Sequence, residues 1–273
     1  MTRERENIDS HIGLCLGGGG GLGFLHIGLF QALEELGIRP GLIAGTSAGA
    51  AFGALYAIGK TIPEMKQIMK GFKWNKIVAP AIPHRGFLST YRMEAFFKKN
   101  IGDCDVSELP IRLKIAAVDV YSGELAAFSK GPLEKCLAAA CAIPGFFQPV
   151  VINGHSYYDA SGMYNLPIEL MHGENLKTII AGNTISQHSL MKTLKTPQDV
   201  YYQAYLIRSV TLTKWRTRDE GWPGRKDEKI VMIDYRSKGT SLLSPDQCMA
   251  FIDDTRSQSL KALSKVFGPR VED

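Results

Sequence analysis

The residue best placed for nucleophilic chemistry is Ser47, the centre of the segment Gly-Thr-Ser-Ala-Gly. An apolar run at 42–44 precedes this segment, and small and apolar residues at 50–58 follow it. A strand, a tight turn and a helix in this order form a nucleophile elbow, which exposes the serine hydroxyl at the end of the strand. Gly45 and Gly49 allow the sharp reversal because they have no Cβ to collide with the backbone. The segment therefore predicts covalent catalysis with Ser47 as nucleophile.

A glycine-rich segment at 17–23 stands between a predicted strand at 11–16 and a predicted helix that ends at Gly37. The amide N–H groups at such a junction can hold an anion, so the segment is typical of an oxyanion hole for the serine of a neighbouring parallel strand.

Two other interpretations of this glycine segment are open. Gly18, Gly20 and Gly23 match the dinucleotide pattern G-x-G-x-x-G, but that pattern requires an acidic residue about 20 positions later. The chain has Gly-Thr-Ser at 45–47 instead. A flexible linker is the least favoured interpretation, because strong apolar elements flank the segment on both sides.

The candidate general base is Asp159, which directly follows a predicted hairpin at 150–158. An aspartate in this setting also commonly caps a turn, so its position alone leaves both roles open. A Ser–Asp–His order would instead require His172 or His188, and neither has a flanking signature, so we expect both to be loop histidines. His26, three residues after the glycine segment, is expected to pack behind the site.

The composition is that of an ordinary globular chain of 273 residues, with 45% hydrophobic and 22% charged residues. Its formal charge of +5 suits an anionic surface or substrate and does not require nucleic acid. The five cysteines have no paired or metal-ligand spacing, which indicates free thiols in a reducing compartment. The N-terminus does not fit a signal peptide, so we expect a cytoplasmic protein, with peripheral contact to a membrane left open. The lack of metal-ligand spacing predicts that there is no metal site.

Alternating strand and helix patterns predict an α/β fold, with a central and mostly parallel sheet covered by helices on both faces. The uncharged run at 40–59 is long enough to suggest a membrane span, but the elbow divides it into a strand and a short buried helix. Helices at 61–72 and 89–99 form an insertion that is placed to cover a site. Later elements are strands within 111–129, a helix at 133–142, a strand at 177–182, a helix at 197–218, a strand at 230–234 and a helix at 245–267.

Tryptophans alternate with basic residues at 214–218 and at 222–226. This pattern is consistent with a patch that touches a membrane interface. A solvated helix end is the favoured interpretation, because nearby acidic residues offset much of the charge.

Four ordered segments resemble the patatin-like phospholipases. They are the glycine segment with His26-Ile27-Gly28, the elbow around Ser47, the run 142–150, and Tyr158-Asp159 followed by Asn165-Leu166-Pro167. The resemblance covers residues 12–184, and 185–273 are less distinctive, within a single expected domain of residues 1–273. Leu22 stands where the family often has Arg or Lys, and Ala160-Ser161 stands where it commonly has Gly-Gly or Gly-Ala.

The resemblance implies a Ser–Asp dyad without histidine, in which Asp159 accepts the proton of Ser47. It also implies that Gly18, Gly19 and Gly20 donate N–H bonds to the oxyanion. The expected activity is hydrolysis of carboxylic esters of phospholipids or lysophospholipids through an acyl-serine intermediate, without calcium or another cofactor. The alternative is a regulatory protein that binds a nucleotide or a lipid and has no hydrolase activity; the oligomeric state is left open.

Overall fold

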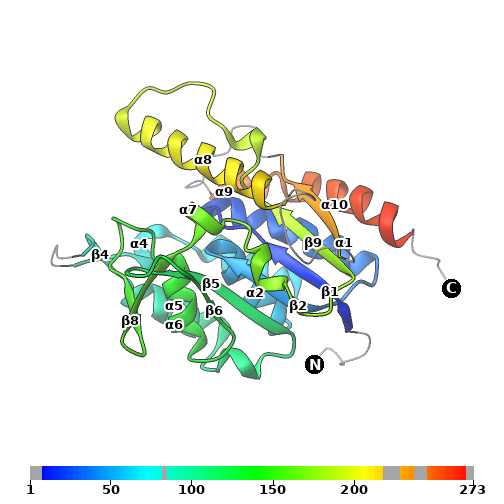
Figure 1. The fold of residues 1–273 in the computed structure, drawn as a ribbon, viewed down its shortest axis with the longest axis horizontal. Helices are drawn as coiled ribbons and strands as arrows, with labels where there is room; N and C mark the ends of the chain where they lie inside the picture. Colours follow the sequence, from blue (N-terminus) through cyan, green and yellow to red (C-terminus); the bar gives the residue numbers. More distant parts are fainter. Residues whose placement is uncertain (1–7, 82–84, 218–227, 237–244, 269–273) are drawn as a thin grey trace.

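The computed structural model describes residues 8–81, 85–217, 228–236 and 245–268 (Figure 1). Five parallel strands form the centre of its main sheet. In spatial order they are β10 (Lys229–Asp234), β9 (Thr178–Asn183), β1 (Asp9–Leu16), β2 (Pro40–Thr46) and β5 (Arg112–Asp119). The mostly parallel sheet expected from the sequence is therefore confirmed.

Strand β5 also carries the antiparallel part of the sheet. It pairs with β6 (Leu125–Phe128) and β8 (His155–Asp159), and β8 pairs with β7 (Val150–Ile152). Residues 115–116 of β5 pair with both β2 and β6, and residues 117–118 pair with both β6 and β8. Because a strand has only two hydrogen-bonding sides, β2 and β8 must lie on the same side of β5, one after the other.

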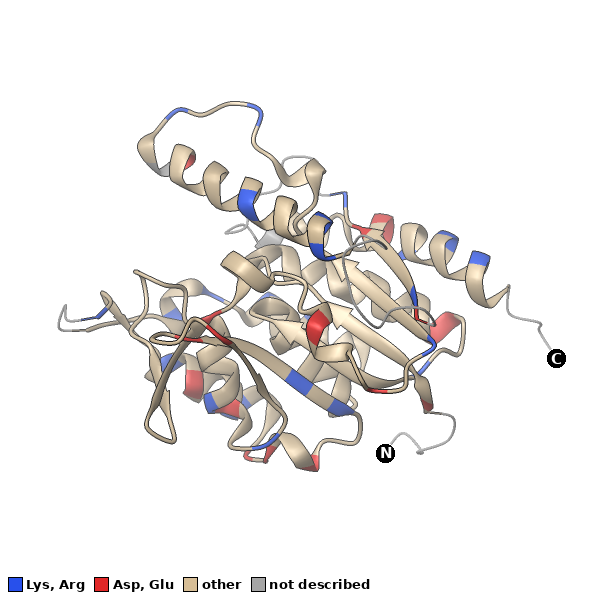
Figure 2. Cartoon of the chain, in the orientation of Figure 1, with Lys and Arg blue, Asp and Glu red and all other residues tan. Residues whose placement is uncertain are grey.

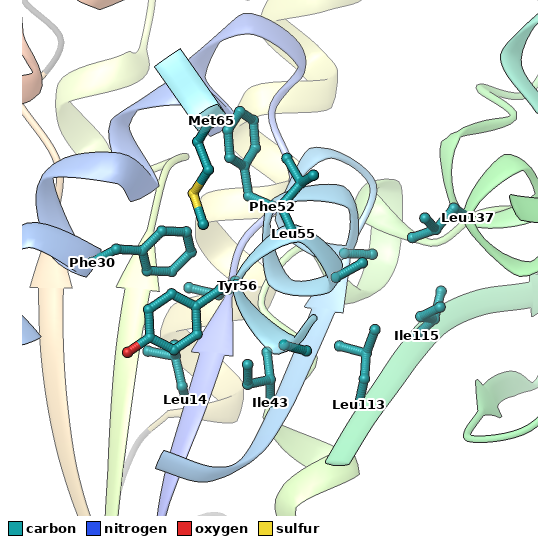
Figure 3. Packing of buried hydrophobic residues seen from close by; sticks show 14 of the residues in the cluster. Leu14, Phe30, Ile43, Phe52, Leu55, Tyr56, Met65, Leu113, Ile115 and Leu137 are labelled. Atoms are coloured by element: carbon teal, nitrogen blue, oxygen red, sulfur yellow. The ribbon is translucent and has the colours of Figure 1, made fainter. Parts of the chain in front are cut away.

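Long helices cover one face of the sheet. They are α1 (His26–Glu35), α2 (Ala48–Ala57), α6 (Leu133–Cys141) and α10 (Ile252–Phe267). Alternate strand residues such as Leu14, Ile43 and Ile115 point to this face and are fully buried (Figure 3). Phe30 of α1 and Tyr56 of α2 lie above them, with ring centroids 4.5 Å apart. This face holds the larger hydrophobic core.

The other face is covered mainly by short elements. The segment after β8 contains α7 (Ser161–Tyr164) and the 3-10 helix η3 (Ile168–Met171), which bury Leu166, Ile168 and Met171 against the sheet. The long helix α8 (Pro197–Arg216) packs on α7. Helices thus lie on both faces, as expected, but those in contact with this face are short.

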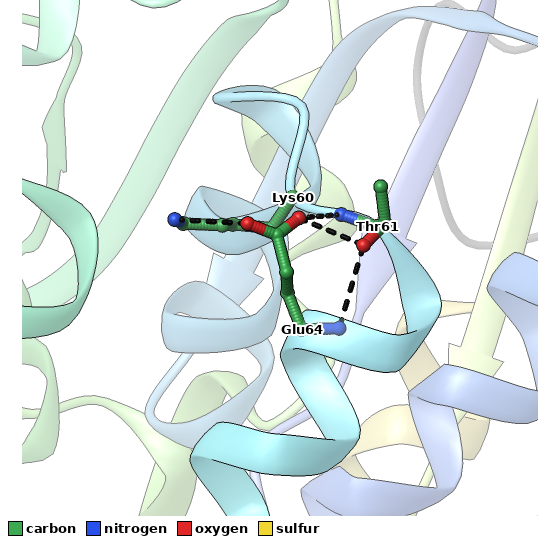
Figure 4. Close-up of polar contacts among 3 residues, drawn as sticks. All are labelled: Lys60, Thr61 and Glu64. Carbon is green, nitrogen blue, oxygen red and sulfur yellow. Dashed lines mark hydrogen bonds and ion pairs between the residues drawn. The ribbon is translucent and has the colours of Figure 1, made fainter. Parts of the chain in front are cut away.

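An insertion between α2 and β5 forms the cover, which we define as residues 62–101. It comprises α3 (Ile62–Gly71), α4 (Trp74–Ile77), the short strands β3 (Ala79–Pro80) and β4 (Leu88–Ser89), and α5 (Tyr91–Ile101). The predicted capping box opens α3: the Glu64 carboxylate accepts from Thr61 N at 2.8 Å, and Glu64 N donates to the Thr61 hydroxyl at 3.4 Å (Figure 4).

Two predicted helix boundaries differ in the structure. The glycine segment first forms a 3-10 helix, η1 (Gly20–Leu25), before α1 begins. The C-terminal helix predicted at 245–267 is two helices, α9 (Pro245–Met249) and α10, because the chain turns at 250–251. Two further 3-10 turns are η2 (Val106–Glu108) and η4 (Gln187–Ser189). Within the described ranges, no helix combines the length and the apolar character needed to cross a membrane.

Candidate active site

Ser47 occupies the turn between β2 and α2 and is 8% exposed. Its backbone has φ 52° and ψ −124°, a left-handed conformation that is costly for a residue with a Cβ. Such strain is maintained only where the surrounding structure enforces it. The elbow predicted from the sequence is therefore present, and the serine itself carries the unusual conformation.

The two elbow glycines are required by close packing of the backbone. A Cβ on Gly49 would lie 2.3 Å from the carbonyl oxygen of Leu16, and one on Gly45 would lie 2.6 Å from Ala50 N. Neither glycine has a positive φ. Gly49 lets the elbow contact the end of β1 directly, which brings the glycine segment against Ser47, and Gly45 lets the first turn of α2 lie close against the end of β2.

Asp159 is brought to Ser47 by the pairing of β8. Thr46, the last residue of β2, pairs with Ala116, and Asp159, the last residue of β8, pairs with Ala117. Since both strands lie on the same side of β5, their C-terminal ends meet head-on. Residues that are 112 positions apart in the sequence thereby become neighbours, since Ser47 directly follows Thr46.

The Asp159 carboxylate is 3% exposed, and burial raises its pKa above the ordinary aspartate value. Oδ1 accepts a hydrogen bond of 2.8 Å from Ser161 N. The Ser47 hydroxyl lies near enough to lower the pKa, yet Oδ2 has no full hydrogen bond with any residue that the structure describes. Asp159 thus has one anchored oxygen and one oxygen free to receive a proton.

The glycine segment lies directly beside the serine, since a Cβ on Gly18 would be 3.0 Å from the Cβ of Ser47. The three glycines predicted for the oxyanion hole are not equivalent, however. Gly18 N donates to the carbonyl oxygen of Asn165 at 3.1 Å, so this amide is already engaged. Gly19 and Gly20, at the start of η1, where a helix leaves amides unpaired, therefore remain the candidate donors of the predicted set.

His26 packs behind the glycine segment, as the sequence suggested. It is fully buried, and burial lowers its pKa to about 4, so the imidazole is neutral at pH 7. Nε2 lies 2.9 Å from the Gly17 carbonyl oxygen and must donate to it, because a carbonyl only accepts. Nδ1 then accepts from the Tyr235 hydroxyl at 2.9 Å. The histidine fixes the segment and does not face Ser47.

The two loop histidines are placed differently. His172 lies 3.7 Å from the carboxylate of Glu228, which directly precedes β10, whereas Ser47 follows the C-terminal end of β2. His172 therefore lies near the N-terminal ends of the parallel strands, whereas Ser47 lies at their C-terminal ends. His188 lies in η4 and is exposed.

Two residues near Ser47 and Asp159 were not singled out from the sequence. Asn165 is 1% exposed, and neither polar atom of its side chain has a hydrogen-bond partner in the described part of the chain. Its amide lies 3.2 Å from where a Cβ of Gly17 or Gly18 would be. The Cys141 thiol lies beside Ser47, and burial raises its pKa, so it stays protonated. Only the pattern Asn-x-Pro after the aspartate marked Asn165 in the sequence.

Helix α8 holds the segment that follows Asp159. The Tyr205 hydroxyl donates to the Ser161 hydroxyl at 3.0 Å. Arg216 forms an ion pair of 2.8 Å with Glu169 and lies over the Tyr164 ring, 4.1 Å from its centroid. Arg216 was predicted to be at a solvated or membrane-facing helix end; instead it points inward. The second basic and aromatic run, 222–226, lies outside the described residues.

A cavity opens from Ser47 beneath the cover. It encloses about 920 Å³ of empty space, part of it open to solvent. The part of the chain before the cover contributes residues such as Phe24 and Phe52, and the cover contributes most of the rest. Cover residues at the cavity are Ile68, Met69, Phe72, Trp74, Ile77, Met93, Phe96, Phe97, Asn100 and Ile101. A nucleophile at one end of an apolar cavity is suited to an ester with a long apolar chain.

Comparisons with known proteins agree with this geometry. The family model described as patatin-like phospholipase matches residues 14–172. An uncharacterised NTE family protein of Mycobacterium bovis is 31% identical over 182 residues, which are 66% of this chain and 50% of that protein. The lysophospholipase NTE1 of Candida albicans is 27% identical over 187 residues, covering 66% of this chain and 14% of that protein.

The chain therefore spans about half, or less, of the length of these relatives. The crystal structure of VipD from Legionella pneumophila has the same fold, with a TM-score of 0.57 and 14% identity over 94% of this chain and 67% of that chain. The family model covers more than half of the sequence and includes the elbow, the glycine segment and Asp159. On these findings, the chain belongs to the patatin-like phospholipase family.

Proposed function

We propose that this protein is a lipid acyl hydrolase that works through a dyad of Ser47 and Asp159. The observation that carries the proposal is the head-on meeting of β2 and β8, which places a buried carboxylate beside a strained serine at the mouth of an apolar cavity. A base with a raised pKa is better matched to the proton of a serine hydroxyl than an ordinary aspartate is.

In the first half-reaction, Ser47 Oγ attacks the ester carbonyl carbon and its proton passes to Asp159 Oδ2. The carbonyl oxygen becomes an oxyanion, which the amides of Gly19 and Gly20 stabilise. The tetrahedral intermediate collapses when the C–O bond to the leaving alcohol breaks, and the alcohol takes the proton from Asp159. In the second half-reaction, water gives a proton to Asp159 and its oxygen attacks the acyl carbon. The bond from that carbon to Ser47 Oγ then breaks, Asp159 returns the proton to Oγ, and the fatty acid leaves.

The proposed substrate class is a phospholipid or a lysophospholipid, with its acyl chain in the cavity. The names of the family and of the Candida albicans relative support this class. The cavity is bounded by apolar side chains at almost every position, which favours a saturated or unsaturated hydrocarbon chain over a polar acid. We also propose that residues 1–273 form one domain, since α8 of the later part holds the segment after Asp159.

The decisive experiment is single-turnover acylation with a p-nitrophenyl ester. We expect Ser47→Ala and Asp159→Asn each to lose about a thousandfold or more, because the first lacks the nucleophile and the second cannot accept its proton. His172→Ala and His188→Ala serve as controls and should stay within about tenfold, equivalent to about 1.4 kcal/mol in the barrier. Melting curves check that each variant is folded. A thousandfold loss in a folded histidine variant would replace the dyad with a triad.

The pH dependence of the same reaction gives an independent test. Asp159 must be ionised to accept the proton, and burial raises its pKa. We therefore expect kcat to fall as the pH decreases, with a midpoint above the ordinary aspartate pKa of 3.8. A midpoint at or below that value would mean that Asp159 is not the titrating base.

A further inference from the structure

A group of exposed apolar side chains lies next to the cavity beneath the cover. Phe87 is 66% exposed and Phe146 is 58% exposed. The two are joined through the backbone, because Phe87 N and Leu88 N both donate to the Phe146 carbonyl oxygen, at 3.0 and 2.9 Å. Ile143, which lines the cavity, accepts hydrogen bonds from the amide of Phe146 at 3.2 Å. The exposed rings therefore stand at the edge of the cavity that holds Ser47.

The charge of the cover is strongly one-sided. Between Glu64 and Glu94 the sequence contains no acidic residue, but it contains six basic ones. They are Lys66, Lys70, Lys73, Lys76, Arg85 and Arg92. In Figure 2 the β3–β4 projection at the far left of the molecule is marked in blue.

Four of these basic residues belong to the same part of the surface as the exposed rings. Lys73 and Lys76 flank Trp74 of α4, a cavity residue, and Arg85 is two residues from Phe87. Arg92 donates to the Val78 carbonyl oxygen at 3.0 Å and to the Tyr91 hydroxyl at 3.1 Å. All four are exposed, and none takes part in an ion pair with a residue that the structure describes. Their positive charge is therefore not neutralised within this part of the protein.

A second exposed apolar group lies on α8 and provides a comparison. Val200, Ile207 and Trp215 are 56%, 48% and 60% exposed. No residue of α8 lines the cavity. The arginine beside Trp215 is paired with Glu169, so its charge is neutralised. Arg208 and Lys214 of α8 are also exposed and form no ion pair with a described residue. The α8 group thus has exposed apolar side chains of similar size and some unpaired charge, but it does not border the cavity.

We propose that the rim of the cavity docks on the surface of an anionic lipid bilayer. The rim consists of four apolar residues and four basic ones: Phe87, Tyr91, Ile143 and Phe146, and Lys73, Lys76, Arg85 and Arg92. Aromatic and aliphatic side chains would enter the interface, while the basic residues face the anionic head groups. This inference rests on the proposed function, because docking in this orientation would turn the open cavity and Ser47 toward the membrane. An acyl chain could then pass from the bilayer to Ser47 without crossing water.

The test is flotation with vesicles of phosphatidylcholine, alone or with phosphatidylglycerol. All variants are made in the Ser47→Ala protein so that hydrolysis does not consume the vesicles. We expect Phe87→Ser with Phe146→Ser to lower binding at least about tenfold, because two interfacial anchors are lost. We expect Lys73→Gln with Lys76→Gln to abolish most of the preference for phosphatidylglycerol. The matched control, Val200→Ser with Trp215→Ser, should bind within about twofold of the parent.

Each other result contradicts the proposal. If the double phenylalanine variant binds like its parent, the rim is not the docking surface. If the α8 control loses binding instead, the α8 face is the membrane surface. Equal binding to both vesicle types would remove the role assigned to charge.

Turnover of a water-soluble p-nitrophenyl ester by the Phe87 and Phe146 variants, with Ser47 intact, separates the two proposals. This turnover should be unchanged within about twofold, because neither ring lines the cavity. If the parent protein with Ser47 intact has no turnover, the hydrolase proposal is contradicted, but the vesicle-binding results still test the docking surface.

Discussion

The floor and the cover of the active site are built in opposite ways. We define the floor as residues 9–57, from β1 through α2. In the floor, main chain packs on main chain: a Cβ on Gly28 would lie 2.4 Å from the Ile252 carbonyl oxygen, and the elbow glycines are equally tight. In the cover, the cavity wall is made of flexible side-chain ends such as Met69 and Met93. A Cβ on Gly71 of α3 would meet nothing within 4 Å.

This difference separates two tasks. A nucleophile, a base and amide donors must hold fixed positions, and backbone contacts fix them best. A hydrocarbon chain has no polar atoms to place, so side chains that can adopt several rotamers are sufficient to enclose it. We expect the floor glycines next to Ser47 to tolerate almost no added atom and the cavity side of the cover to tolerate several. The contrast does not extend to every glycine: a Cβ on Gly86 of the cover would lie 2.4 Å from the Phe147 backbone, and one on Gly37 of the floor would meet nothing within 4 Å.

The largest difference should come from a Gly→Ala substitution, which adds one methyl group, made once in the floor and once in the cover. Gly49→Ala puts a Cβ against the Leu16 carbonyl oxygen and should cost about 3 kcal/mol or more of unfolding free energy. Gly71→Ala, the matched control in the cover, should be neutral or stabilising by about 0.5–1 kcal/mol because alanine favours the helix. Chemical denaturation measures both. A Gly49→Ala protein as stable as its parent would show that the floor can relax.

The next effect is the dependence of the unfolding free energy on pH, which we expect in a different pH range for the floor and for the cover. His26 in the floor has a folded pKa of about 4, below the ordinary 6.5. Between these values the unfolded chain binds a proton that the folded chain does not, so the unfolding free energy falls as pH decreases, by up to about 3 kcal/mol. His26→Gln should remove this part of the slope.

Glu64 at the start of the cover has its pKa lowered to about 2 by the hydrogen bonds from Thr61. Its contribution is fully present above the ordinary 4.5 and is lost as pH falls toward 2. Because Glu64 is exposed, we expect Glu64→Gln to change the slope less than His26→Gln does. Urea unfolding as a function of pH compares the two. A Glu64→Gln effect that lies mainly above pH 4.5, or a His26→Gln effect that lies mainly below pH 4, would contradict the assignment.

A smaller effect is expected from two asparagines, one packed against the floor and one in the cover. Asn165, which lies against the floor, has a buried amide without a partner in the described chain, so Asn165→Leu should leave the melting temperature unchanged or raise it. If that amide helps to hold the oxyanion, kcat falls about 10–100-fold. Asn100 in the cover donates to the Phe96 carbonyl oxygen at 2.8 Å. Asn100→Leu should therefore lower stability slightly and leave kcat almost unchanged; the reverse pattern would overturn both assignments.

The smallest effect should come from reshaping the cover itself. Phe97→Leu enlarges the cavity and should cost about 1 kcal/mol or slightly more of stability. We expect kcat/KM to shift toward longer acyl esters by about fourfold for each CH₂ newly buried, equivalent to about 0.8 kcal/mol. A series of p-nitrophenyl esters measures the shift. An identical chain-length profile would show that acyl chains do not occupy this cavity.

The sequence predicted best what depends on local chemistry. The apolar run before Ser47 and the capping box at Thr61 and Glu64 each determine their own conformation, and both are present as expected. The five central strands also followed from their apolar runs. Local context left Asp159 undecided between a base and a turn cap, and the resemblance to a known family favours the base.

The features that the sequence did not predict depend on distant partners. Gly18 looks identical to its neighbours in the sequence, but the Asn165 carbonyl oxygen engages its amide. Arg216 lies in a run that looks solvated, and its partner Glu169 is 47 positions away. The meeting of β2 and β8 depends on which side of β5 each occupies, and no periodicity in either strand specifies a side.

The backbone of Ser47 has one consequence for anyone who tries to make this protein more robust. A glycine at position 47 would adopt φ 52° without strain, so Ser47→Gly should melt at a higher temperature than the natural protein while having no nucleophile. A library selected only for heat resistance would therefore be drawn toward an inert protein at this position. Any such screen has to reward turnover together with survival, because at residue 47 the two properties oppose each other.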